Sequence, residues 1–535
     1  MKNFLSKTAA GLALLLLVSG DVSACTIMFV TKGASTDGSV FVAHSNDCFG
    51  GDPNVVFVPA KNHKRGSLRP VYPSAAAYDE MPEYNCFTSP HLVAPERSDA
   101  YNFPDKPQTK PIGYIPEVEH TYAYIDAEYP AMNEHGLMLG ECTDKSAHLL
   151  KTPYKDGGGI FYSTELGCVA LERCKTAREA IELMGALIDE YGLYGTAEAL
   201  FVADKDEGWL FEMQPTPSGK GGLWIAEKIP DGHFSIAANQ LRIRAIREND
   251  PNQIFNPKLP QMLEELGWAA HDAQGNLDWV KSLRGEEFNH PYYSMRRVWR
   301  GFSTVAPSLN LSPTVDDWDS DYYPMSVRPD KKLTVADVMS LYRDYYKDTE
   351  FDKSASNFAG LYGSPYHYEN EKRTERGILS AKTAYSYVAQ LNDKLPAPIC
   401  WVSINTPFEN PFVPFAVAKM PSAYEKALRD TYDASKMYWA SAQVMALTQG
   451  YWNVMSPIVA ETVQQSEKNS LKLVEASAGL SKNKFVAALN QNAVKVFDDW
   501  KNLYTQLLLK YDAGAGVKYD ERHLPDSDAP TKYHK

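Results

Sequence analysis

Several features that would assign this chain to a common class of protein are missing from its sequence. After the first two dozen residues, no uninterrupted apolar run reaches about 18 residues, the length that a membrane-spanning helix needs. Lys and Arg form only short clusters such as Arg296-Arg297, and the formal net charge is −13. The mature chain is therefore expected neither to span a membrane nor to bind nucleic acid, which requires a concentrated positive surface.

Cysteine is scarce, and the common metal and nucleotide motifs are absent. The seven cysteines in 535 residues are too few to hold so long a chain together, and their odd number leaves at least one thiol free or paired between chains. The twelve histidines show no metal-ligand spacing, and there is no P-loop, GxGxxG or HExxH motif and no internal repeat. We therefore predict a fold that depends on its hydrophobic core and that carries no metal ion or other cofactor.

The first 24 residues have the features of a secretory signal peptide. Lys2 and Lys7 supply the positive charge, residues 9–18 form a short apolar run, and Val22-Ser23-Ala24 offers acceptable residues for a cut before Cys25. Export to the periplasm or the outside of the cell is therefore expected, where disulfides are permitted. After the cut, Cys25 would be the first residue of the chain.

The distribution of apolar residues predicts antiparallel hairpins separated by helices. Residues 26–31 and 40–43 are typical of two strands around the turn residues 35–39. Further strands are predicted within 121–144, 199–214, 221–243, 383–391 and 397–407, and helices within 163–191 and 422–511. In the last of these, Tyr424, Leu428 and Tyr432 recur at every fourth position. Because groups of hairpins alternate with helices, the pattern predicts an α+β fold with stacked sheets rather than a doubly wound nucleotide-binding fold.

Cys25 has three interpretations. It can be a small buried core residue, the default for a cysteine. It can be the acylated first residue of a surface lipoprotein, because residues 22–25 fit a loose lipobox, although Gly20-Asp21 interrupt the apolar run and a strand follows at once. It can also be an N-terminal nucleophile, because its own α-amine has a pKa of about 7.7–8.0 and can exchange a proton with its thiol near neutral pH. A lipid would block both groups, so the last two interpretations exclude each other.

Several motifs, in order, carry a family resemblance. The stretch CTIMFVTKGASTDGSVFVAHSND resembles the start of the dipeptidase A family of cysteine peptidases, which are N-terminal-nucleophile hydrolases. The later segments MNEHGLMLGECT, AANQLRIR, SVRPDKKLTVADVMSLYRDYY and NTPFENPFVPF resemble further motifs of that family. The resemblance runs from Cys25 to about Phe415. It implies a four-layer αββα fold, in which two antiparallel sheets lie between helical layers, and a relation to penicillin V acylases and bile salt hydrolases.

The resemblance implies a domain division and roles for three polar residues. We expect a signal peptide at 1–24, a hydrolase domain at 25–421, a helical region at 422–515 and a polar tail at 516–535. Asp47 matches the aspartate near the terminal amine, although it also suits a turn after a strand. Asn239 matches the asparagine that donates to the oxyanion, or it is simply a polar strand end. Thr143 lies near the second oxyanion position, where the acylases carry asparagine.

Three further positions concern charge at the site. His44 stands where the acylases carry arginine, and it would supply a cation only when protonated; otherwise it is an ordinary strand histidine. Arg373 and Arg376 could bind a substrate carboxylate, although charged turn residues are usually only solvated.

The prediction from sequence is an exported cysteine dipeptidase that acts on small peptides through a thioester on Cys25. A penicillin V acylase or bile-salt-hydrolase-like enzyme is a second hypothesis, and a non-catalytic lipoprotein acylated at Cys25 is a third. The helical region at 422–515 leaves a homo-oligomer open.

Overall fold

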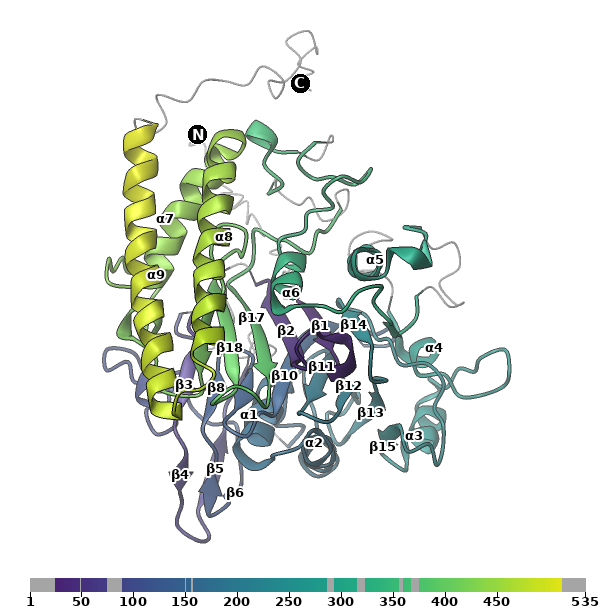
Figure 1. The fold of residues 1–535 in the computed structure, drawn as a ribbon. Helices are drawn as coiled ribbons and strands as arrows, with labels where there is room; N and C mark the ends of the chain where they lie inside the picture. Colours follow the sequence, from purple (N-terminus) through teal and green to yellow (C-terminus); the bar gives the residue numbers. More distant parts are fainter. Residues whose placement is uncertain are drawn as a thin grey trace, which may run out of the picture.

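The fold was analysed in a computed structural model (Figure 1). The structure describes residues 25–48, 50–74, 89–149, 151–154, 157–285, 293–314, 323–355, 359–366 and 375–511. The expected signal peptide and polar tail lie outside these ranges, as do Cys86 and Arg373.

Two large antiparallel sheets form the centre of the molecule. The first has the order β16-β14-β1-β2-β17-β18-β19. Its strands are β16 (Ser326–Val327), β14 (Phe234–Ala237), β1 (Thr26–Val30), β2 (Val40–Asn46), β17 (Tyr385–Leu391), β18 (Ile399–Ile404) and β19 (Val413–Ala416). The strand that follows Cys25 therefore lies in the interior of the sheet, hydrogen-bonded on both sides, to β14 and to β2.

The second sheet has the order β15-β13-β12-β11-β10-β9-β8-β3. Its strands are β15 (Gln253–Phe255), β13 (Gly222–Lys228), β12 (Gly208–Pro215), β11 (Ala197–Ala203), β10 (Met138–Asp144), β9 (Met132–Asn133), β8 (Tyr124–Asp126) and β3 (Val56–Val58). Two small ribbons pair β4 (Lys61–Asn62) with β7 (His120–Thr121), and β5 (Leu68–Val71) with β6 (Gly113–Pro116).

The two sheets pack face to face, with β1 and β2 against β10 and β11. Glycine permits the close approach at two points. A Cβ on Gly140 of β10 would lie 2.9 Å from Val42 Cγ1 and 3.2 Å from the Ala43 carbonyl oxygen of β2. A Cβ on Gly208 would lie 1.9 Å from the ring of Phe29, which also packs on Phe201. Any larger residue at these positions would push the sheets apart where Cys25 and β10 must meet.

Helices pack on the second sheet. The helices α1 (Ser163–Arg173) and α2 (Ala177–Tyr191) contact β10–β13, and α3 (Leu259–Leu266) contacts β13. A capping box between Thr176 and Glu179 starts α2, and its apolar face repeats at helical spacing in Ala180, Ile181, Met184 and Ile188. The short helix α4 (Trp279–Leu283) follows later in the chain.

Other helices pack on the first sheet. The helix α5 (Met295–Val305) contacts β14, and α6 (Val335–Leu341) contacts β17. The helices α7 (Met437–Gly450), α8 (Trp452–Ala476) and α9 (Lys482–Lys510) lie side by side and pack on β18 and β19 (Figure 1). Short 3-10 turns are η1 (Lys32–Ala34), η4 (Asp99–Tyr101), η5 (Pro307–Leu309), η6 (Leu361–Gly363) and η7 (Ser422–Tyr424). The molecule is thus a mixed α+β fold with antiparallel sheets, as predicted.

Most of the predicted elements are confirmed, and one is wrong. The hairpins β1/β2, β11/β12 and β17/β18 and the helices α1 and α2 occur where the patterns place them. Helix does not begin at Ser422, however, because only η7 forms before α7 starts at Met437. The side chain of Asp433 accepts hydrogen bonds from the backbone and hydroxyl of Ser435, and Lys426 has a positive φ of 56°. This local turn chemistry overrides the four-residue spacing of Tyr424, Leu428 and Tyr432.

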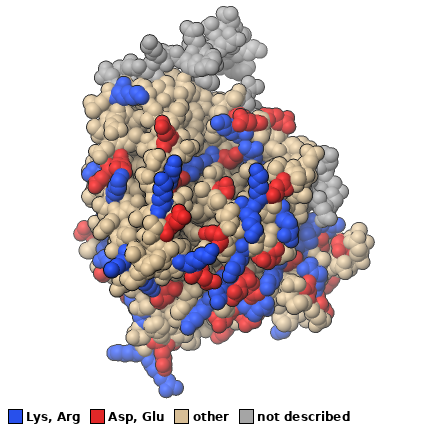
Figure 2. Space-filling model, viewed as in Figure 1, with Lys and Arg blue, Asp and Glu red and all other residues tan. Residues whose placement is uncertain are grey.

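Neither a charged patch on the face shown in Figure 2 nor a disulfide marks a functional region in the described part of the chain. On that face, Lys and Arg alternate with Asp and Glu, so it presents no continuous basic stripe. No disulfide joins any two of the six cysteines that the structure describes. Within the described ranges, no helix is both long and apolar enough to cross a bilayer.

Candidate active site

Cys25 lies between the two sheets, fully buried, at the start of β1. Its Sγ, a ring nitrogen of His44 from β2 and a carboxylate oxygen of Glu141 from β10 all lie within 4.8 Å of one another. The nucleophile predicted from sequence therefore sits beside polar groups from both sheets.

His44 is neutral in this environment. Its Nδ1 lies 2.7 Å from the Glu141 carbonyl oxygen, which can only accept, so Nδ1 carries the hydrogen and Nε2 does not. Three tyrosine rings surround the imidazole, and burial lowers the pKa of His44 to about 3. At neutral pH, His44 therefore does not supply the positive charge that an arginine supplies at the corresponding position of the acylases.

The buried His44 makes stability depend on pH in a defined direction. Between about pH 6.5 and 3, the unfolded chain takes up a proton on this histidine and the folded chain does not, so stability falls on acidification. We expect this group to remove about 2 kcal/mol between pH 7 and pH 5. Urea unfolding of His44→Gln at both pH values should show a drop smaller by that amount than in the parent protein. Equal drops in the two proteins would contradict a neutral buried imidazole.

Arg297 of α5 is a site residue that the sequence analysis missed. Its side chain is fully buried, and Nη1 donates to the Cys25 carbonyl oxygen and to Thr26 Oγ1, both at 2.9 Å. Its Nη2 donates to Asn239 Oδ1 at 2.7 Å. One guanidinium thus ties the first two residues of the expected mature chain to Asn239. In the sequence, the adjacent pair Arg296-Arg297 is the signal at this position, but two adjacent charges do not indicate that either side chain is buried.

Asn239 and Thr143 are in direct contact. Asn239 follows β14 with a positive φ of 63°, and its Nδ2 donates to the Thr143 carbonyl oxygen at 2.6 Å. The Thr143 hydroxyl donates to Glu141 Oε1 at 3.3 Å. With Oδ1 held by Arg297, the orientation of the Asn239 amide is determined at both ends.

Asp47 and Arg376 form a buried ion pair. Arg376 Nη2 donates to Asp47 Oδ2 at 2.6 Å, and Thr383 Oγ1 donates to Asp47 Oδ1 at 2.6 Å. The Ser45 hydroxyl also donates to Asp47 Oδ2, at 3.1 Å, and accepts from the backbone N–H of Thr26 at 3.2 Å. Asp47 is therefore connected to the start of β1, while the guanidinium of Arg376 is engaged inside the protein.

A group of buried carboxyls lies on the second sheet next to Cys25. Burial, the neighbouring charge of Glu198 and then Cys25 raise the pKa of Glu141 well above its usual value. Burial raises the pKa of Glu198 to about 7, although its Oε1 accepts from Tyr162 and Thr196 at 2.5 and 2.6 Å. Burial and these neighbours therefore favour the neutral form of Glu141 beside Cys25.

The thiol, imidazole and carboxyl of Cys25, His44 and Glu141 are also a donor set that a zinc ion accepts. The sequence predicted no metal ion here. Hydrolysis through a thiol nucleophile and its own α-amine requires no metal ion.

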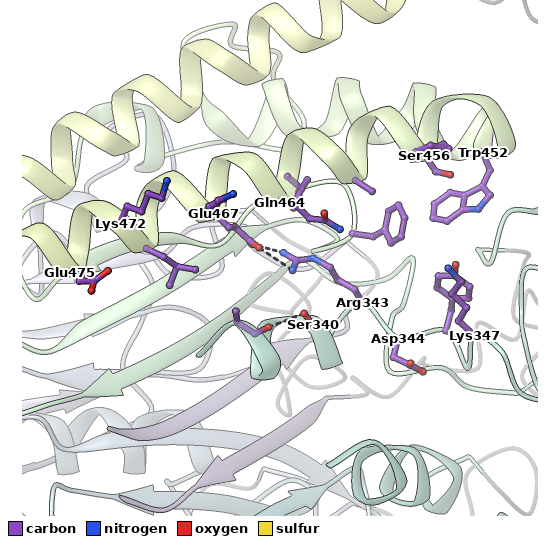
Figure 3. Close-up of a pocket in the computed structure, with 18 residues that line it drawn as sticks. Ser340, Arg343, Asp344, Lys347, Trp452, Ser456, Gln464, Glu467, Lys472 and Glu475 are labelled. Carbon is purple, nitrogen blue, oxygen red and sulfur yellow. Dashed lines mark hydrogen bonds and ion pairs between the residues drawn. The ribbon is translucent and has the colours of Figure 1, made fainter. Parts of the chain in front are cut away.

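A separate groove of about 770 Å³ lies between α8 and the segment around α6 (Figure 3). Arg343 crosses it and donates to Glu467 of α8 at 2.5 and 3.1 Å. None of the residues predicted from sequence for the active site lines this groove. Its bidentate ion pair connects α8 to the segment that follows α6.

Comparison with known proteins identifies the family. The sequence model described as "Peptidase family C69" matches residues 91–465, more than half of the chain. The chain belongs to peptidase family C69. It is therefore a peptidase, of the cysteine type by its family. The family model confirms the resemblance drawn from the motifs.

Curated relatives of this C69 peptidase have consistent names. A "Probable dipeptidase" of Latilactobacillus sakei is 25% identical over 81% of this chain and 80% of its own length. A "Probable dipeptidase" of Salmonella dublin is 26% identical over 72% of this chain and 78% of its own. A "Dipeptidase A" of Lactobacillus helveticus is 22% identical over 93% of this chain and 98% of its own. The similarity thus extends over most of each protein.

Proposed function

We propose that this C69 peptidase is an exported dipeptidase that uses Cys25, as the first residue of the mature chain, as its nucleophile. The names of the relatives support the substrate class. The observation that carries the proposed mechanism is the guanidinium of Arg297, which contacts both the Cys25 carbonyl and Asn239. It holds the candidate nucleophile and the candidate oxyanion donor in one buried network.

The reaction follows from these positions. The α-amine of Cys25 accepts the thiol proton, and Sγ attacks the carbonyl carbon of the peptide bond. The second N–H of Asn239 Nδ2 and a backbone N–H stabilise the oxyanion, a contribution of about 2.7–4 kcal/mol for one such donor. The ammonium then protonates the leaving amine as the C–N bond breaks, which leaves a thioester. Water, deprotonated by the same amine, hydrolyses the thioester and restores the thiol.

Asp47 and Arg376 act on this chemistry through position. The Asp47 carboxylate favours the protonated α-amine, and Ser45 connects it to the backbone N–H of Thr26. Arg376 keeps Asp47 in place, so we assign it a positioning role in place of the substrate-binding role expected from sequence. Thr143 positions Asn239 through its carbonyl oxygen.

The arrangement of sheets and helices supports an N-terminal-nucleophile hydrolase fold of four αββα layers. Two antiparallel sheets pack on each other, and helices pack on each of them. The nucleophile would begin an interior strand of one sheet, where both neighbouring strands hold it rigidly.

Purified exported protein tests the proposed function directly. We expect the intact mass of the protein to equal that of a chain that begins at an unmodified Cys25. We also expect neutral dipeptides to be hydrolysed far faster than penicillin V or taurine-conjugated bile acids. The control is the same protein after alkylation of its reactive thiol, which should be inactive. A diacylglyceryl adduct on Cys25 would favour the lipoprotein hypothesis, and preference for the acyl amides would favour the acylase.

A further inference from the structure

Several of the buried polar groups beside Cys25 have few protein partners. The carboxyls of Glu141 and Glu198 lie within hydrogen-bond reach of each other. Beyond that contact, no other described residue pairs with Glu141 Oε2, Glu198 Oε2 or the Tyr129 hydroxyl, although all three residues are buried. Nor does any described Lys, Arg or His form an ion pair with Glu141 or Glu198. Polar atoms that folding withdraws from water are normally hydrogen-bonded, because leaving them unpaired is unfavourable. Two carboxyls and a phenol in one place therefore indicate a ligand that donates hydrogen bonds and carries positive charge.

We propose that Glu141, with Glu198 and Tyr129 beside it, binds the α-ammonium group of the first residue of the substrate. This inference rests on the proposed role of Cys25 as nucleophile. It makes the enzyme selective for peptides with a free amino terminus.

The distances around Cys25 suit this ligand. In an amino acid residue the α-nitrogen lies about 2.5 Å from the carbonyl carbon, two bonds away. Attack requires that carbon at about 3–3.5 Å from Sγ. A Glu141 carboxylate oxygen lies within 4.8 Å of Sγ, so an ammonium on the attacked residue can reach it at a hydrogen-bond distance of about 2.7–2.9 Å.

An ammonium group would bring a positive charge to this group of buried carboxyls. Burial and the neighbouring acid raise the pKa of Glu141, and burial, Glu141 and other neighbours raise the pKa of the Tyr129 hydroxyl. An ammonium group bound here would donate a charge-assisted hydrogen bond to a carboxylate oxygen of Glu141. An acyl group without an amine cannot form this charge-assisted hydrogen bond, which disfavours penicillin V and conjugated bile acids as substrates.

The experiment compares alanyl-alanine with propionyl-alanine, which differs only in lacking the α-amine. EDTA is present throughout, because Cys25, His44 and Glu141 also match a metal-ligand set. We expect kcat/KM of the parent protein to favour alanyl-alanine by about 100-fold, since a hydrogen bond to a charged group is worth about 10- to 100-fold. Glu141→Gln should reduce that ratio to about 10-fold or less by slowing alanyl-alanine alone.

A matched control and a second measurement complete the test. Glu409→Gln changes another buried glutamate whose pKa burial raises to about 7, held by Tyr366 and Thr406, and it should leave the ratio unchanged. If Glu141→Gln does not fold, the parent protein still decides the question, because alanine should inhibit competitively and propionate should not.

The outcomes separate this inference from the proposed function. Equal kcat/KM for the two substrates, both dependent on Cys25, would overturn the ammonium subsite and keep the nucleophile. An unchanged ratio in folded Glu141→Gln would also overturn it. Hydrolysis of alanyl-alanine that survives Cys25→Ala would overturn the proposed function itself.

Discussion

Replacing Cys25 by alanine is expected to abolish dipeptide hydrolysis, with a loss of about 10⁴-fold or more in kcat/KM. The substitution removes the only atom that forms the thioester, while the α-amine remains. Cys25→Ser should retain a small residual activity, because an alcohol is a poorer nucleophile than a thiol near neutral pH. The activity of both variants is measured as the rate at which amine is released from a neutral dipeptide. Circular dichroism checks that both variants fold.

Cys400→Ala is the matched control for this prediction. Cys400 is also fully buried, in β18, and burial raises the pKa of its thiol far above the usual value, so it is chemically inert. We expect a moderate loss of stability from the small cavity and no loss of kcat. Activity that persists in folded Cys25→Ala would exclude the nucleophile, and a comparable loss in Cys400→Ala would assign the effect to packing.

Replacing Arg297 by alanine is expected to lower kcat by about 10²- to 10³-fold and to destabilise the fold by about 3 kcal/mol. Without the guanidinium, the Cys25 carbonyl and Asn239 Oδ1 lose their buried donor. The Asn239 amide can then rotate away from the oxyanion. Steady-state kinetics at a temperature where the variant is folded, together with urea unfolding, separate the two effects.

Arg69→Ala provides the comparison, because Arg69 is equally buried but pairs with Glu165 and Glu172 of α1. It should destabilise the protein by about 3–5 kcal/mol and leave kcat of the folded enzyme unchanged. If Arg297 acts through Asn239, then Asn239→Ala should cost much less activity in the Arg297→Ala background than in the parent protein. Additive losses in that double-mutant cycle would exclude the positioning role.

Local patterns were sufficient for most of the secondary structure. The β1/β2 hairpin followed from β-branched and apolar runs around Asp37-Gly38, and the helices α1 and α2 followed from apolar residues at helical spacing. Such signals are carried by residues close in the chain. The helical prediction at 422–436 failed because a spacing of four residues does not reveal the side-chain turns at Asp433.

The pairing of sheets could not be derived in this way. Strands β13 and β14 follow each other in the chain, yet they belong to different sheets. That crossing brings Asn239, at the end of β14, to Thr143 at the end of β10. Nothing in either segment encodes the contact, because it depends on which sheet each strand joins.

By itself, the sequence determined the candidate nucleophile, the α+β class and the family, because ordered motifs and periodic apolar residues are local properties of the chain. Tertiary structure alone decided the charge state of His44, the role of Arg297 and the partner of Arg376. Each of these depends on desolvation and on hydrogen-bond partners distant in the chain, such as Cys25, which lies 272 positions before Arg297. Tertiary packing determines this burial and these contacts, and no local sequence pattern indicates them.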